Sequence, residues 1–124
     1  MKNNKIRYIK VKNGVVSIHM TSNFKRVMEE EFGTMAYDTT DYIFNENLDI
    51  RIFVEDLSLE NKDVCINYYY NNDLWTTFNG TVLFAKDGVT KFRSLSKKDI
   101  NIIINNLIPT CDNEFNIYVK QYDN

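Results

Sequence analysis

Apolar and polar residues alternate along most of the chain, as they do in β-strands that are buried on one face. The N-terminal stretch KIRYIKVKNGVVSIHM shows this alternation on both sides of Asn13-Gly14. This dipeptide favours the positive φ angles of a two-residue type I′ turn, and the turn fixes the register of the two strands. The sequence therefore predicts an N-terminal β-hairpin that pairs Val11 with Val16, Ile9 with Ile18 and Arg7 with Met20.

The same register places His19, the only histidine of the chain, beside Tyr8 on the other face of the hairpin. Neither strand carries a carboxylate that would orient the imidazole as a general base. We interpret His19 as a surface side chain without a catalytic role.

After the hairpin, the spacing of apolar residues changes from that of a strand to that of a helix. Thr21 or Ser22 is suited to cap a helix over about residues 23–32, and Gly33 is suited to end it. We predict that this helix packs on a sheet through one apolar face, formed by Phe24, Val27, Met28 and Phe32.

A second helix is predicted in KKDINIIINNLI, which follows Ser96 as its N-terminal cap. Asp99 lies in the first turn, where a negative charge is stabilised by the helix dipole. Pro109, the only proline, ends the helix. Its expected buried residues are Ile100, Ile103, Ile104 and Leu107.

Between the helices, residues 63–95 have the pattern of three or four short strands joined by tight turns. Asn79-Gly80 and Asp87-Gly88 are both typical of two-residue hairpin turns. Such turns predict five cross-strand pairs: Thr77–Val82, Trp75–Phe84, Phe84–Lys91, Val82–Arg93 and Leu83–Phe92.

The remaining alternating stretches complete the predicted fold. LDIRIFVE and EFNIYVKQY are expected strands, and a short strand is expected at residues 42–44. The element order is then ββα-βββ(β)-α-β. We predict a single α+β domain over residues 1–124, with a mainly antiparallel sheet of five to seven strands and two helices packed on it.

Composition is that of an ordinary globular protein, with 44% hydrophobic and 26% charged residues. The longest apolar run of the second helix is too short to cross a membrane, and the N-terminus lacks the apolar segment of a signal peptide, so we expect a cytoplasmic protein. Cys65 and Cys111 have no metal-site spacing and are expected to be buried thiols. Neither a metal nor another cofactor is expected.

Charge is distributed unevenly, although the net charge is only −2. Residues 1–28 contain seven Lys or Arg and no acid, residues 29–63 contain eleven acids against two bases, and the rest balances six against six. The acidic segment is either a solvated surface that the basic hairpin neutralises or a docking face for a basic partner. The residues expected to bind such a partner are Glu29, Glu30, Glu31, Asp38, Asp41, Glu55 and Asp56.

The sequence carries no glycine-rich phosphate loop and no Ser-His-Asp or Cys-His arrangement, so we do not expect an enzyme. We predict a small binding protein that inhibits or regulates a basic, nucleic-acid-handling protein, as bacteriophage anti-defence and toxin-immunity proteins do. This expectation is an analogy of size and charge. An exposed edge strand would also allow pairing with a second copy.

Two alternatives remain open from the sequence. The predicted pairs in residues 63–95 place aromatic and cationic side chains on one face, which is typical of sites that bind nucleotides or single-stranded nucleic acid. That site would comprise Trp75, Phe84, Lys91 and Arg93, with Tyr68 and Tyr70. The second alternative is a metal-dependent nuclease, because Glu60-Asn61-Lys62 has the E-x-K form found in such enzymes.

Overall fold

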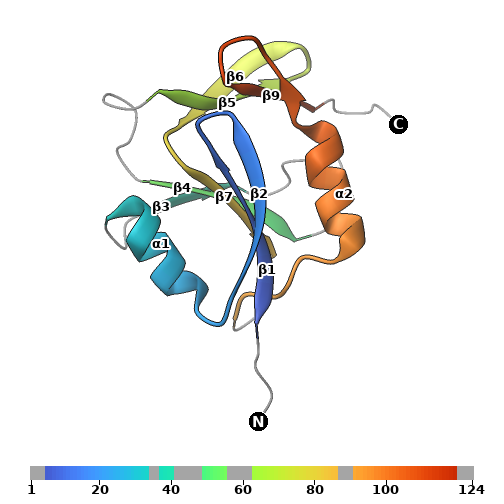
Figure 1. The fold of residues 1–124 in the computed structure, drawn as a ribbon. Helices are drawn as coiled ribbons and strands as arrows, with labels where there is room; N and C mark the ends of the chain where they lie inside the picture. Colours follow the sequence, from blue (N-terminus) through green and yellow to red (C-terminus); the bar gives the residue numbers. More distant parts are fainter. Residues whose placement is uncertain (1–4, 34–36, 41–48, 56–62, 87–90, 120–124) are drawn as a thin grey trace.

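The computed structural model describes residues 5–33, 37–40, 49–55, 63–86 and 91–119 (Figure 1). In these ranges the chain forms nine strands and two helices. The predicted α+β class is confirmed. The strands are more numerous than the five to seven expected, and they form two sheets rather than one.

The first sheet is antiparallel throughout and has the strand order β2-β1-β7-β4-β3. Its edges are therefore β2 and β3, and β7 lies at its centre. The strands are β1 (Ile6–Lys12), β2 (Val15–Thr21), β3 (Tyr37–Thr40), β4 (Ile50–Glu55) and β7 (Val82–Lys86).

The second sheet has the order β6-β5-β9-β8. Within it β5 pairs with β9 in parallel, while the other two pairs are antiparallel. The strands are β5 (Val64–Tyr70), β6 (Asp73–Asn79), β8 (Ile108–Pro109) and β9 (Phe115–Val119).

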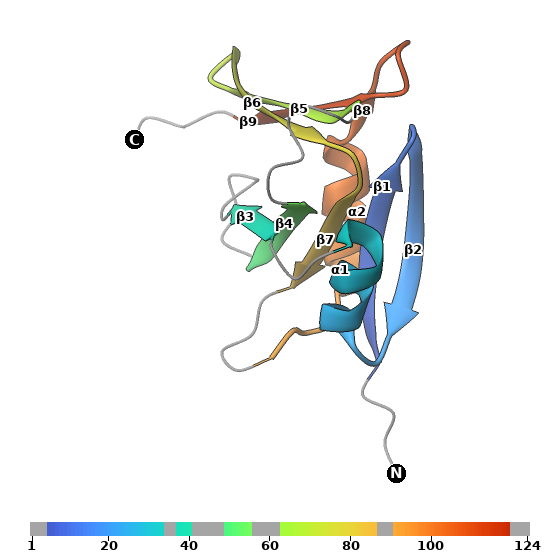
Figure 2. The same ribbon diagram turned by 90° about the vertical axis from the view of Figure 1, so that its left-hand side faces the viewer.

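Both faces of the first sheet are buried, because α1 (Phe24–Phe32) covers one face while α2 (Lys97–Asn106) and the second sheet cover the other (Figures 1 and 2). Alternation along each strand supplies the two clusters of core residues. The smaller cluster, under α1, includes Tyr8, Phe53, Leu83, Phe24 and Met28. The larger cluster, facing α2 and the second sheet, includes Ile9, Ile52, Phe84, Ile66, Ile103 and Ile117.

The predicted N-terminal hairpin is confirmed in its full register, with Val11 opposite Val16 and Ile9 opposite Ile18. Asn13 and Gly14 form the turn with φ angles of 51° and 77°. His19 lies beside Tyr8 as expected, with the two rings stacked at a centroid distance of 5.4 Å.

The first helix forms as predicted but is capped one residue later than expected. The cap is Asn23, whose side-chain oxygen accepts from the backbone N–H of Arg26 at 3.2 Å. Gly33 ends the helix in the left-handed conformation, with φ of 70°. Phe24, Met28 and Phe32 are buried, as their spacing predicted.

The second helix is also confirmed, with Ser96 as its cap and Asp99 completing a capping box. It ends at Asn106, earlier than predicted, because Ile108 and Pro109 form the short strand β8. Ile104 was expected in the core, but its side chain is 42% exposed.

The predicted hairpin at Asn79-Gly80 is wrong. β6 pairs with β5 through a turn at Asn71-Asn72, and the chain then crosses at Gly80 from the second sheet into the first. The Thr77–Val82 and Trp75–Phe84 pairs therefore do not form. The reason lies in β7, in which Val82, Leu83, Phe84 and Ala85 are all buried. A strand that is apolar on both faces is stabilised most by a central position, which β7 has between β1 and β4.

The predicted register at Asp87-Gly88 is also wrong. Residues 87–90 lie outside the described residues, but a bridge pairs Lys86 with Arg93. This spacing excludes a two-residue loop, so none of the three predicted pairs, Phe84–Lys91, Val82–Arg93 and Leu83–Phe92, forms. The strand expected at residues 42–44 lies outside the described residues.

Candidate partner-binding site: an acidic hollow

A polar hollow lies where the tip of the β1–β2 hairpin, the C-terminal end of α1 and the second sheet meet. Its volume is about 910 Å³. The residues that line it are Lys12, Asn13, Glu31, Asp63, Val64, Cys65, Gly80, Thr81, Asp112, Asn113 and Glu114.

The lining contains four carboxylates and one lysine. Glu31 is neutralised, because its carboxylate lies 3.1 Å from Lys10 Nζ and 4.0 Å from Lys12 Nζ. Asp63 and Asp112 are exposed and form no ion pair with any described residue. Two unneutralised carboxylates facing one hollow make its rim a region of negative potential.

The fourth carboxylate, Glu114, is held by a neutral partner, since its Oε1 accepts a hydrogen bond from Asn67 Nδ2 at 2.9 Å. The same amide group donates to Asn116 Oδ1 at 3.0 Å. These bonds fix the position of the Glu114 carboxylate and leave its negative charge in place.

Backbone hydrogen bonds hold the segments that carry the acidic residues. The N–H of Gly80 donates to the carbonyl of Asp63 at 2.9 Å, and the N–H of Thr110 donates to the carbonyl of Glu114 at 2.9 Å. The hydroxyl of Thr110 accepts from the N–H of Asp112 at 3.2 Å. The rim of the hollow is therefore organised before any partner binds.

The hollow does not supply a reactive thiol. Cys65 is buried, and its Sγ donates to the carbonyl oxygen of Val11 at 3.5 Å. Burial raises the pKa of Cys65 to about 12, so the thiol stays protonated at neutral pH. Cys111, which we expected to be buried, is exposed on the loop between β8 and β9.

Only part of the predicted docking face can be placed. Glu29 and Glu30 are exposed on α1, with Glu30 3.2 Å from Arg26 Nε, while Glu31 turns to the hairpin lysines. The basic hairpin thus neutralises the residue of α1 that is nearest to the hollow. Asp41, Asp56 and the side chains of Asp38 and Glu55 lie outside the described residues.

Sequence reasoning did not single out Asp63, Asp112 or Glu114 as partner-binding residues. Asp63 belongs to the acidic segment, but the other two lie in a segment with no net charge excess. Their one local signal is the run Asp112-Asn113-Glu114 just before β9. This run lies close to Glu31 only because the N-terminal hairpin packs against residues distant in the sequence.

The alternative aromatic site is not assembled as one face. Phe84 is 0% exposed at the centre of the first sheet, whereas Trp75 is 65% exposed on β6 at the edge of the second. Tyr68 is buried and contacts Trp75, with 5.5 Å between ring centroids. Arg93 is 3.0 Å from Asp49, while Lys91 and Tyr70 are exposed elsewhere on the chain. The wrong register at Asn79-Gly80 was the source of this prediction.

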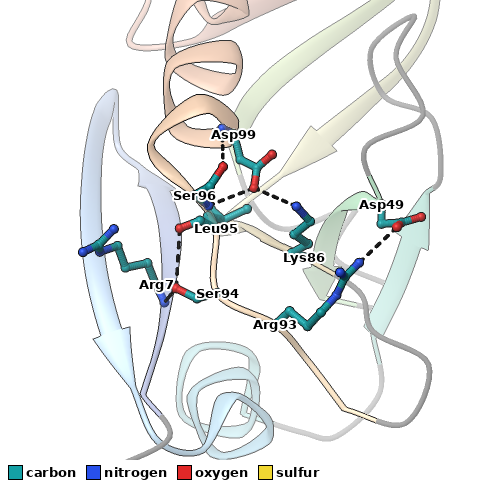
Figure 3. A network of polar contacts seen from close by, with 8 residues as sticks. All are labelled: Arg7, Asp49, Lys86, Arg93, Ser94, Leu95, Ser96 and Asp99. Atoms are coloured by element: carbon teal, nitrogen blue, oxygen red, sulfur yellow. Dashed lines mark hydrogen bonds and ion pairs between the residues drawn. The ribbon is translucent and has the colours of Figure 1, made fainter.

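A second cluster of charged groups lies between β7 and α2 (Figure 3). Asp99 Oδ2 accepts from Lys86 Nζ at 3.1 Å and from the backbone N–H of Ser96 at 2.8 Å. Burial by itself would raise the pKa of Asp99, but the hydrogen bonds from Ser96 and Lys86 outweigh it and lower the pKa below the usual range.

The adjoining segment 94–95 joins this cluster to β1. The N–H of Leu95 donates to the carbonyl of Arg7 at 3.2 Å, and the N–H of Arg7 donates to the hydroxyl of Ser94 at 2.9 Å (Figure 3). The cluster therefore fixes the start of α2 against the first sheet, and we assign it a structural role.

In the described part of the chain, no three His, Cys, Asp or Glu side chains are grouped to hold a metal ion. Glu60-Asn61-Lys62, the E-x-K sequence, lies outside the described residues. The ring of His19 forms a hydrogen bond between its Nε2 and the hydroxyl of Ser17 at 2.7 Å. No helix in the described ranges is both long and apolar enough to span a membrane.

Comparison of the chain with protein-family models, with curated proteins and with solved structures finds no match.

Proposed function

We propose that this chain is a small, non-enzymatic binding protein that docks a basic protein partner through the acidic hollow. The observation that carries the proposal is the set of four carboxylates in the hollow's lining, of which only Glu31 is paired with lysines. Asp63 and Asp112 are exposed and free of cationic partners among the described residues, so cations of a partner can reach them.

The chemistry of the lining favours arginine and lysine side chains as occupants. A guanidinium group forms paired, charge-assisted hydrogen bonds with carboxylates, and a lysine ammonium group fits as a point charge. A hollow of about 910 Å³ is large enough for several side chains. Its polar lining is poorly suited to an apolar small molecule.

The partner class we propose is a cytoplasmic protein that handles nucleic acid. Such proteins present clusters of Lys and Arg that bind phosphate groups. A protein that offers carboxylates to the same cations competes with nucleic acid for that surface. The chain then acts as an inhibitor or regulator, of the kind found among bacteriophage anti-defence and immunity proteins.

The test is affinity capture from a host lysate, performed with and without nuclease treatment. The wild-type chain is compared with Asp63→Asn/Asp112→Asn and with the matched control Glu29→Gln/Asp73→Asn, which removes two exposed charges outside the hollow. We expect a stoichiometric basic protein that survives nuclease, dissociates in high salt and is lost only from the hollow variant. Equal capture by both variants would refute the proposal.

A further inference from the structure

The edge strand β2 presents backbone hydrogen-bonding groups to solvent. Its pairing with β1 across the two-residue turn uses the N–H and C=O groups of Val15, Ser17, His19 and Thr21. The groups of Val16, Ile18 and Met20 point away from β1. In the ribbon drawings β2 forms one border of the first sheet, with no strand beyond it (Figure 2).

Proteins usually protect such edges with charged side chains, proline, bulges or very short strands. Of the four edge strands that the structure describes, three have at least one such feature. β8 has two residues, one of which is Pro109, β3 has four residues, and β6 contains Asp73 and pairs with β5 through register shifts. β2 has seven residues in uninterrupted register, with neither lysine, carboxylate nor proline.

The side chains of β2 are also unusually apolar for an edge strand. Ile18 is 50% exposed and Met20 is 57% exposed. Both lie on the face of the first sheet that is covered, towards its centre, by α2 and the second sheet. Val16, on the same face, is half-buried against the core. The row Val16, Ile18, Met20 therefore extends the core to the open edge of the sheet.

We propose that β2 pairs antiparallel with β2 of a second copy of this chain, about a two-fold axis at Ile18. Ile18 then lies opposite Ile18 of the second copy, and Val16 lies opposite Met20. Each outward-facing N–H of these residues meets a C=O of the other copy. One sheet continues through both molecules, and the two α2 helices lie on the same side of it.

A second copy fits this edge better than a charged partner does. Val15–Thr21 contains no Lys, Arg, Asp or Glu, so self-pairing places no like charges opposite each other. The only ionisable side chain, His19, lies opposite the hydroxyl of Ser17. The apolar row is self-complementary, because a two-fold axis pairs its ends with each other.

The expected dimer is weak, since it buries a single strand edge and a short apolar row. That area is below the roughly 1,200–2,000 Å² of standard stable interfaces, so we expect a dissociation constant on the order of 10 µM. The dimer uses β2 and is independent of the acidic hollow.

Sedimentation of the full chain at concentrations from about 1 µM to about 1 mM tests the proposal. The average mass of the wild type is expected to rise from 14.7 kDa towards twice that value. Ile18→Lys, which places two lysines opposite each other, should stay monomeric. The matched control Leu74→Lys replaces another exposed apolar residue, 53% exposed on the edge strand β6, and should dimerise like the wild type.

Cross-linking tests the register separately. In a Cys111→Ser background, Ile18→Cys should form a disulfide-linked dimer under mild oxidation, because opposed residues of a strand pair have a Cα separation that a disulfide can span. Met20→Cys should not, because its two copies lie far apart in this register. A monomeric wild type at about 1 mM, or loss of the dimer in Leu74→Lys but not in Ile18→Lys, would overturn the proposal.

Discussion

Gly14 at the tip of the β1–β2 hairpin packs directly against Asn113 in the loop between β8 and β9. A Cβ atom placed on Gly14 would lie 3.0 Å from the Cβ and 3.1 Å from the Cα of Asn113. The two residues come from opposite ends of the chain, and Asn113 lines the acidic hollow together with Asn13, the neighbour of Gly14 in the turn. Their close approach therefore joins the two sheets at the site proposed to bind a partner.

Replacing Gly14 with alanine should destabilise the protein more than replacing Gly33. Both glycines have positive φ, 77° and 70°, and this conformation costs an alanine about 1–2 kcal/mol. Gly33 has no atom within 4 Å of the added Cβ, whereas at Gly14 the backbone of Asn113 must shift. Overpacking of this kind adds about 1–3 kcal/mol.

Urea unfolding of Gly14→Ala and Gly33→Ala, followed by circular dichroism, measures the difference. We expect a lower midpoint for Gly14→Ala at an unchanged slope. Equal midpoints for the two variants would mean that the space around Gly14 accommodates a Cβ atom without a shift of Asn113.

Asp99→Ala should lower the free energy of unfolding by about 2–3 kcal/mol. The substitution removes the acceptor for the N–H of Ser96 and leaves Lys86, whose side chain is 21% exposed, without its carboxylate. Lys86→Met should cost less, because Asp99 keeps its hydrogen bonds with Ser96. A double-mutant cycle by urea unfolding measures the coupling, and additive losses would contradict a direct interaction.

The contribution of Asp99 should also depend on pH. Its pKa in the folded state lies below the ordinary value of 3.8, so the folded state favours the ionised carboxylate more than the unfolded state does. The resulting stabilisation is complete above pH 3.8 and is lost as the pH falls through the lower, folded-state value.

Unfolding of the wild type and of Asp99→Asn, compared from pH 7 down to about pH 2, measures this dependence. The stability difference should be constant at neutral pH and shrink in the acid range. A difference that grows on acidification would show that the pKa of Asp99 is raised in the folded state.

The parts of the fold that were predicted correctly depend on local signals. The turn of the hairpin at Asn13-Gly14 and the alternation of apolar residues along its strands specify the same register. Each helix is specified in the same local way, by a capping residue and an apolar face that lie close together in the sequence. The hairpin predicted at Asn79-Gly80 is wrong because a pair of residues suited to positive φ marks a change of direction without specifying which strands it joins. The clue was the run Val82–Ala85, whose apolar character on both faces indicates a central strand.

The site was less predictable than the fold, because charge along the sequence does not report charge compensation in space. Glu31 belongs to the most acidic segment, yet Lys10 neutralises it across 21 positions of sequence. Asp112 and Glu114 come from a segment with no net charge and yet contribute two of the four carboxylates in the lining of the hollow. Only the packing of the hairpin on the second sheet brings these residues together.

If the acidic hollow binds basic side chains, a nona-arginine peptide should bind there in low salt. Each exposed ion pair contributes about 0.2–1 kcal/mol, so removing two carboxylates in Asp63→Asn/Asp112→Asn should weaken binding roughly twofold to thirtyfold. Glu29→Gln/Asp73→Asn removes the same charge elsewhere and should change the affinity by less.

Calorimetry measures the affinities, and amide shifts in ¹⁵N-labelled protein locate the peptide. We expect the largest shifts at Gly80, Thr81 and Asn113, which line the hollow. Shifts concentrated on α1, with equal affinities for the two double variants, would place the basic partner on the helix instead.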